Sequence, residues 1–258
     1  MRDATLPSIP PCHETSLRYR LAPMVFPAAT RHGMAFLNLK RNRYLGIGRA
    51  DSLILSKYLD GLPTLDIWGT DAGELPNDDS RRAALLDSLT RSEILTLNRN
   101  PRSEIVSTKV SLDGDLVSIG YEITGEPSVG PREIALFLYC LLCSAVSLRV
   151  VPLRHIVRRV YHRRNAAVSN GYAFSLSGAT KLVATFQTIR PYFFLSKDRC
   201  LLHALALIEY LAHHDQYPML VFGVKTDPWG AHAWVQHGTF LLDCSPEQVC
   251  GLEQILGV

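Results

Sequence analysis

In its last quarter the chain reads Cys200-Leu201-Leu202-His203-Ala204-Leu205-Ala206-Leu207-Ile208-Glu209-Tyr210-Leu211. This run is apolar and rich in strong helix formers, so it predicts a helix that is largely buried. Ser196 precedes it as a plausible N-cap, which would place Cys200 in the first helical turn. There the helix dipole and the free N–H groups favour a thiolate, the form of cysteine that acts as a nucleophile.

Two residues with acid–base side chains follow on predicted strands. An apolar strand at 219–224 and a Pro-containing loop lead to His232 in segment 231–236 and to Asp243 in segment 239–244. The pair His237-Gly238 predicts a two-residue hairpin loop between these two segments.

This loop would set the pairing of the hairpin. It pairs Gln236 with Thr239, and steps of two residues then bring Trp234 opposite Leu241 and His232 opposite Asp243. Directly opposed residues share a sheet face, with Cβ atoms about 4.5–5.5 Å apart. The pattern therefore predicts a catalytic triad in which Cys200 is the nucleophile, His232 the base and Asp243 the group that orients the base.

Other interpretations of the same residues stay open. They could be a buried cysteine, a core histidine and a capping aspartate, since free cysteine is commonly buried. A zinc site could use Cys200, His203, His232 and Cys244. A non-enzymatic scaffold that carries peptides with a degenerate triad is a third alternative.

The stretch from Cys200 to Asp243 resembles the transglutaminase-like cysteine protease of lasso-peptide maturation, the B protein. That family shows a cysteine before an apolar helix, a Gly-Val-Arg/Lys-Thr-x-Pro-aromatic loop, a His-x-Trp-Val segment and an aspartate after the next strand. The matching segments here are Gly223-Val224-Lys225-Thr226-Asp227-Pro228-Trp229 and His232-Ala233-Trp234-Val235. Gln236 departs from the pattern, because relatives often carry Glu there, but it lies next to the turn and off the triad face.

The resemblance implies an activity and partners. It implies a Cys-His-Asp peptidase, with Cys200, His232 and Asp243 in those roles, that removes the leader of a ribosomally made precursor peptide. A partner cyclase similar to asparagine synthetase would then join the freed amine of the core peptide to an acidic side chain. No cofactor is implied, and acyl transfer of the transglutaminase type is the alternative enzyme class for the same triad.

A second resemblance lies near the N-terminus. Segments 33–39 and 43–47 have the pattern of strands around a turn at Arg41-Asn42, and Asp51 precedes a helical pattern at 52–59. This order resembles the leader-recognition domain that is similar to the small peptide chaperone of PQQ biosynthesis, a winged-helix-like unit with a three-stranded sheet followed by helices. Its family role is to bind a leader peptide as an added strand.

Four residues are the candidates for leader binding. We expect Leu45, Ile47 and Leu55 on the buried side of the bound leader and Arg43 as a charge contact. The alternative is that the apolar residues form the core of the small domain, and for Leu55 this alternative is favoured.

The predicted fold class is α+β with two domains. Residues 14–100 would form the recognition domain, closed by helical patterns at 81–88 and 92–97. Residues 101–130, rich in Gly, Pro, Ser and Asp, would form a linker with little core of its own. Residues 131–258 would form a transglutaminase/papain-like protease domain that begins with an apolar helix at Pro131.

Composition excludes several other classes. The net charge of +3 over 258 residues gives no argument for nucleic acid, and no Gly-rich phosphate loop is present. The uncharged run 134–148 is shorter than the roughly 18 residues of a membrane span, so we expect a buried helix there. No signal peptide is recognisable and six cysteines are too few for a disulfide scaffold, which favours the cytoplasm. The spacing of Cys140 and Cys143 within an apolar helix does not predict a metal site. The basic stretch 149–164 predicts a solvated amphipathic helix, and binding of an acidic partner or of the leader peptide is the alternative role for it.

Overall fold

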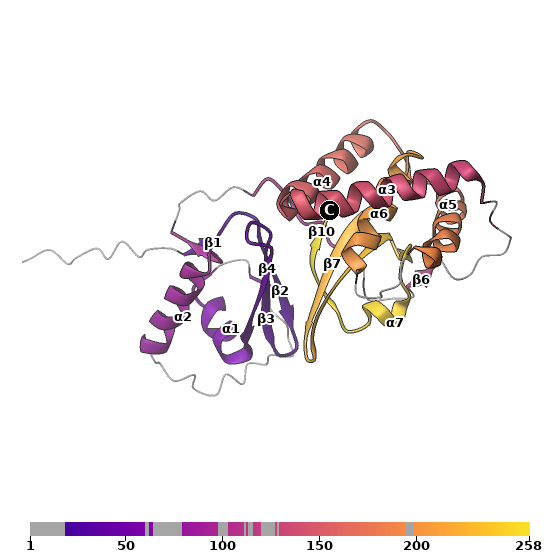
Figure 1. Ribbon diagram of the computed structural model, residues 1–258. Helices are drawn as coiled ribbons and strands as arrows, with labels where there is room; N and C mark the ends of the chain where they lie inside the picture. The colour runs from indigo at the N-terminus through magenta and orange to yellow at the C-terminus, as the bar shows by residue number, and fades with distance from the viewer. Residues whose placement is uncertain are drawn as a thin grey trace, which may run out of the picture.

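Two main sheets organise the described part of the chain, a three-stranded one from the N-terminal half and a five-stranded one from the C-terminal half, beside a two-stranded pair of β1 and β5 (Figure 1). This computed structural model describes residues 19–59, 62–63, 79–97, 103–110, 112, 116–119, 127, 129–193 and 199–258. The strands are β1 (Arg20–Leu21), β2 (Val25–Thr30), β3 (Gly33–Asn38), β4 (Arg43–Gly48), β5 (Leu95–Thr96), β6 (Val117–Ser118), β7 (Met219–Thr226), β8 (Trp229–His237), β9 (Phe240–Leu241) and β10 (Glu253–Gly257). The helices are α1 (Arg49–Ser56), α2 (Asp79–Arg91), α3 (Pro131–Val150), α4 (Leu153–Ser169), α5 (Leu176–Ile189), the 3-10 turn η2 (Arg190–Tyr192), α6 (Cys200–Ala212) and α7 (Pro246–Val249). The mixed α+β class is confirmed.

The small sheet has the strand order β2-β3-β4 and is antiparallel throughout. Asn42 takes a positive φ of 51° in the β3–β4 turn, as the sequence predicts for that turn. Gly33 begins β3 at φ 143°, where a Cβ would lie 2.1 Å from the carbonyl oxygen of Ile47, so only glycine fits. Side chains on one face pack with α1 and α2 around the buried Leu55. The three-stranded sheet followed by helices is therefore present, while its winged-helix-like recognition role stays a prediction.

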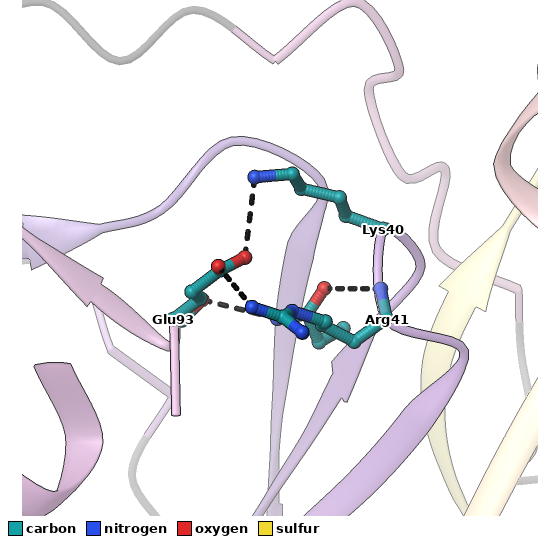
Figure 2. Close-up of polar contacts among 4 residues, drawn as sticks. Lys40, Arg41 and Glu93 are labelled. Carbon is teal, nitrogen blue, oxygen red and sulfur yellow. Dashed lines mark hydrogen bonds and ion pairs between the residues drawn. The ribbon is translucent and has the colours of Figure 1, made fainter. Parts of the chain in front are cut away.

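The end of the first half differs from the sequence prediction. Segment 92–97 was predicted to be helical, but the chain turns at Glu93, which has a φ of 55°, and β5 then pairs with β1. The Glu93 carboxylate accepts hydrogen bonds from Lys40 at 3.2 Å and from Arg41 (Figure 2). The Arg41 hydrogen bond and, next, that of Lys40 lower the pKa of Glu93 to about 2. These long-range contacts explain why a locally helical pattern does not form a helix.

The larger sheet has the strand order β10-β7-β8-β9-β6. Helix α6 packs against β7 and β8, and α3 packs along α6. Helix α3 begins at Pro131 as predicted, and its buried side chains are Phe137, Cys140 and Ser144. By length and composition α3 could cross a membrane, with a mean hydropathy of 1.8, and only one of its sides is buried. The prediction of a buried helix therefore holds for that side alone.

Helix α4 carries the basic stretch and is amphipathic, as predicted. Its apolar side chains Leu153, Ile156, Val157 and Val160 are buried. On its polar side Arg159 and Arg163 pair with Glu209 of α6 at 3.3 and 2.7 Å. Part of the positive charge of α4 is thus neutralised within the fold.

The two sheets share one apolar core. Phe26, Ala28 and Leu37 of the small sheet belong to the same buried cluster as Leu220 and Leu256 of the larger sheet. A part-buried hydrogen bond of 2.8 Å also joins the hydroxyls of Thr30 and Thr226. The two halves are therefore joined by a shared apolar cluster and not by the chain connection alone.

The expected linker at 101–130 has more structure than predicted. Ile105 and Ile119 are buried in the shared cluster, and β6 lies parallel to β9 at the end of the larger sheet. The N–H of Thr108 donates to the carbonyl oxygen of Gly257 at 2.9 Å. The strand-like pattern at 116–119 does form a strand, β6, and the described part of this segment packs with the C-terminal half.

Candidate active site

Cys200 is the first residue of α6, so the predicted start of this helix agrees with the structure. The residue before it, Arg199, is the N-cap, with φ −112° and ψ 40° and no side-chain capping hydrogen bond. Ser196, the predicted N-cap, lies outside the described residues. Cys200 is half-buried at a helix terminus whose first N–H groups have no acceptor within the helix, which is a suitable place for an anion.

His232 lies near the middle of β8 and pairs with Gly223 on β7. Its ring stacks on that of Trp234, with centroids 6.0 Å apart and planes 15° from parallel. A Cβ on Gly223 would lie 2.7 Å from the Trp234 ring, so glycine at that position makes room for the indole beside His232. The Nε2 atom of His232 is buried and has no hydrogen-bond partner among the described residues.

Burial decides the protonation of His232. It lowers the pKa of this imidazole below its ordinary value, so the ring is neutral at pH 7 and can accept a proton. A neutral histidine with a free ring nitrogen is the form required of a general base.

Asp243 is placed by a hairpin register that differs from the predicted one. The structure pairs Gln236 with Leu241 and His237 with Phe240, so Gly238-Thr239 forms the loop. The prediction that Gln236 pairs with Thr239 and that His232 lies directly opposite Asp243 is therefore wrong.

Side-chain contacts, one of them with a distant segment, explain the shift. His237 stacks on Phe174 of another segment, with ring centroids 3.9 Å apart, which keeps it in the strand rather than in the loop. The Gln236 amide accepts a hydrogen bond from the Trp234 indole at 2.8 Å and donates one to the Gly238 carbonyl at 2.7 Å. These bonds favour a loop at residues 238–239 over the predicted loop at 237–238. Gly238 takes the positive φ of 57° that the loop requires.

The Asp243 side chain is buried and hydrogen-bonded to the backbone. Its Oδ1 accepts from the N–H of Val235 at 2.8 Å, beyond the end of β9. Burial raises the pKa of Asp243 to about 7, while the Val235 hydrogen bond and the charge of Arg190 act in the opposite direction. The described residues contain no hydrogen bond that joins Cys200, His232 and Asp243 to one another, so the triad stays a prediction.

Arg190 is a nearby charged residue that the sequence did not predict. Its guanidinium lies 3.0 Å from Nδ1 of His203, one turn after Cys200 on α6, and donates to Oε1 of Gln187 at 3.0 Å. Its charge also lowers the pKa of Asp243, so Arg190 connects the first turn of α6 with the surroundings of that carboxyl. Nothing in the sequence spacing indicates this, because Arg190 lies at the end of a different helix.

The zinc alternative does not fit these positions. Burial, with the charges of Arg190 and Arg199, lowers the pKa of His203 to about 4, and its Nδ1 is already in contact with Arg190. Burial, and after it the neighbouring carboxyl of Asp243, raises the pKa of the Cys244 thiol. Within the described ranges, no group of three or more His, Cys, Asp or Glu side chains is gathered closely enough to hold a metal ion.

The four predicted leader-binding residues lie on or behind β4. Arg43 is exposed at the start of this strand, which has no hydrogen-bonded neighbour on its outer side within the described sheet. Leu45 and Ile47 are half-buried and pack with the fully buried Leu55 of α1. Leu55 is therefore a core residue, and the binding role of all four residues stays a prediction.

A cavity of about 460 Å³ lies elsewhere, beside Met24, Lys40, Glu93 and Arg154. None of the three candidate triad residues lines it. The candidate active site therefore rests on the positions of Cys200, His232 and Asp243 and not on this cavity.

Comparison with known proteins agrees with the C-terminal part of the fold. Residues 140–256 match the model of the transglutaminase-like superfamily. No curated protein and no solved structure matches the chain. The matched segment contains Cys200, His232 and Asp243, and the superfamily includes cysteine peptidases and acyl transferases.

Proposed function

Starting from a transglutaminase-like superfamily domain at residues 140–256, we propose that this chain is the leader peptidase of lasso-peptide biosynthesis. The observation that carries the proposal is the position of Cys200 as the first residue of a helix packed against β8, the strand that holds His232. Asp243 lies two residues after the end of β9. Cys200, His232 and Asp243 all lie within the segment that matches the superfamily model. The motifs that resemble those of the lasso-peptide B protein support this substrate class within the superfamily.

The proposed reaction has two steps. His232 first takes the proton of the Cys200 thiol. The sulfur attacks the scissile carbonyl carbon, and the resulting oxyanion is stabilised by the backbone N–H at the start of α6. Collapse of this intermediate breaks the C–N bond, and His232 gives the departing amine of the core peptide its proton. Water, deprotonated by His232, then attacks the thioester and releases the leader as a carboxylic acid, which restores the thiol.

In this proposal the N-terminal half binds the leader. An extended leader segment would add to the outer side of β4 through backbone hydrogen bonds, with Arg43 as a charge contact. The freed amine would pass to a cyclase similar to asparagine synthetase, and any need for ATP would belong to that partner. Since the precursor is made on ribosomes, we place the reaction in the cytoplasm.

Acyl transfer is the second candidate, because the superfamily includes acyl transferases. The first step would be the same, but an amine rather than water would attack the thioester. The two reactions differ in their products, so one experiment separates them.

The experiment incubates the full-length protein with the precursor peptide encoded beside its gene and follows product masses. Leader removal should require Cys200 and fall by about 10³-fold or more in Cys200→Ala, with a similar loss in His232→Ala. Cys250→Ala serves as the matched control, because Cys250 is exposed and lies outside the candidate triad, and it should keep full activity. Full activity in Cys200→Ala would refute the peptidase proposal, and a product that carries an added amine would favour acyl transfer.

The recognition role has its own test. Arg43→Glu should weaken binding of the leader peptide and turnover of the precursor, while cleavage of a short leaderless surrogate stays unchanged. Arg31→Glu, at the exposed β2–β3 turn, is the matched control for charge. Equal leader affinity in the two variants and the unaltered protein would exclude Arg43 from the binding site.

A further inference from the structure

The cavity of about 460 Å³ lies where the two halves of the chain meet. The N-terminal half forms most of its wall, with Met24 just before β2, Lys40 after β3 and Glu93 before β5. Arg154, the second residue of α4, lines it from the C-terminal half. The volume is in the usual range of a ligand pocket, and neither the candidate triad residues nor the predicted leader-binding residues line it.

Two residues on the wall of this cavity have a left-handed backbone. Met24 has a φ of 66° and Glu93 a φ of 55°, which residues other than glycine rarely adopt. Hydrogen bonds fix both residues. The carbonyl oxygen of Met24 accepts from the N–H of Leu39 at 3.0 Å, and that of Glu93 accepts from the buried Asn38 amide at 3.1 Å. Strained residues that are fixed by their surroundings gather at ligand sites, and here they shape the wall in advance of binding.

The charged side chains of the cavity favour an anion. Two cations, Lys40 and Arg154, line it against one carboxylate, that of Glu93. The two oxygens of this carboxylate already accept hydrogen bonds from Lys40 and Arg41 (Figure 2). An ammonium has three N–H donors and a guanidinium five, so both lining cations can bind a further acceptor.

Arg154 is the cation best placed to receive that acceptor. Its Nε donates to the His155 ring at 3.1 Å, and the described residues give it no carboxylate partner. It lies in the first turn of α4, which contains no acidic residue, so the helix dipole adds positive potential there. With one positive charge in excess along the wall, a singly charged carboxylate fits better than a doubly charged phosphate.

An apolar surface adjoins these charges. Ala22, Pro23, Met24 and Leu95 supply it. A small inorganic anion would leave this surface in contact with water, whereas an anion with an apolar neighbour covers it and gains from its burial. The ligand chemistry that fits is therefore a carboxylate beside an apolar group.

We propose that this cavity binds the carboxylate side chain of an acidic residue in an extended peptide, with an apolar neighbour of that residue against Met24 and Leu95. The position suits a peptide, because Asn38 on the cavity wall pairs with Arg43 at the start of β4. A peptide added to β4 thus passes the end of the sheet at which the cavity lies. Arg154 contacts the same peptide from the C-terminal half, so both halves hold it. Only the identification of this peptide with the precursor rests on the proposed function.

The test follows binding by NMR of the full-length protein labelled with ¹³C in its methionine methyl groups. Met24 lines the cavity, whereas Met34 and Met219 are buried in the two sheets and serve as internal references. The probe is the peptide acetyl-Leu-Glu-amide, and acetyl-Leu-Gln-amide is its uncharged match. The Glu peptide should shift the Met24 signal saturably and bind about tenfold more tightly than the Gln peptide, since its acceptor is charged.

Arg154→Gln should weaken binding of the Glu peptide by about tenfold and remove most of its advantage over the Gln peptide. Arg149→Gln is the matched control and should bind like the unaltered protein, because Arg149 is exposed near the end of α3 and does not line the cavity. Lys40→Gln should weaken binding as Arg154→Gln does. Unchanged Met34 and Met219 signals show that each variant is folded.

Equal affinity for the Glu and Gln peptides, or equal affinity of Arg154→Gln and Arg149→Gln for the Glu peptide, would overturn the proposal. Hexanoate tests a free organic acid as the source of the same chemistry. Tighter binding of hexanoate than of the Glu peptide would overturn the assignment to a peptide, and weaker binding supports it.

These measurements involve no cleavage and no change at Cys200. If the Glu peptide binds as expected and the precursor is not cleaved, the peptidase proposal fails and the carboxylate site stands. If the precursor is cleaved and the Met24 signal does not respond to the Glu peptide, the peptidase proposal stands and the carboxylate site is refuted.

Discussion

Leu37 tests whether the two halves of the chain unfold as one unit. This side chain on β3 is fully buried, and it lies in the apolar cluster that contains Leu220, Phe222 and Leu256 of the C-terminal half. Replacement by alanine leaves a cavity in a shared core, which costs about 2–5 kcal/mol in the free energy of unfolding. For a chain of this size that corresponds to a fall in Tm of roughly 4–20 °C.

The assay compares two probes of thermal unfolding in a Trp68→Phe, Trp229→Phe background, in which the remaining tryptophan is the fully buried Trp234. Circular dichroism reports the whole chain, whereas tryptophan fluorescence then reports the C-terminal half. With a shared core, Leu37→Ala should lower both transitions by the same amount. Leu97→Ala, at a side chain 44% exposed, should change stability by less than about 0.5 kcal/mol.

One result would refute the reasoning. If Leu37→Ala lowers the circular dichroism transition while the tryptophan transition stays in place, the halves are independent domains joined by a linker. That outcome would agree with the sequence expectation of separate domains at residues 14–100 and 131–258. Equal shifts in the two transitions would mean that the two halves unfold as one cooperative unit around their shared core.

The remaining predictions concern two carboxyl groups and the response of stability to pH. The pKa of Asp243 is raised from 3.8 to about 7, so the folded state binds a proton more tightly than the unfolded state and stability falls as pH rises through that window. Asp243→Asn should therefore flatten this fall in urea unfolding between about pH 4 and pH 7 while it slows precursor cleavage, and an identical slope in both proteins would contradict the burial argument. The pKa of Glu93 is lowered to about 2 by its bonds to Arg41 and Lys40, so its contribution is present above about pH 4.5 and is lost as pH falls toward 2. Glu93→Gln should be less stable than the unaltered protein at pH 7 and converge with it near pH 2, and a constant difference across this range would exclude the charge of Glu93 as the cause.

Elements with a strong local signal were predictable from the sequence. The helix that begins at Cys200, the helix that begins at Pro131 and the strands around Asn42 all lie where the pattern places them. Apolar periodicity, a proline at a helix start and a turn residue with positive φ act through neighbouring residues. For the same reason the candidate residues Cys200, His232 and Asp243 could be selected from their sequence setting alone.

The tertiary structure decided what depends on distant partners. The β8–β9 register follows from the stacking of His237 on Phe174, sixty-three residues earlier in the chain, and hairpin composition alone does not contain that contact. The contact of Arg190 with His203 and the hydrogen bond between Thr30 and Thr226 likewise join segments that no periodicity relates. The sequence by itself thus determined which elements form and which residues are chemically suitable. Packing between the two sheets decided which of those residues meet, because the free energy of apolar burial depends on area removed from water and not on order along the chain.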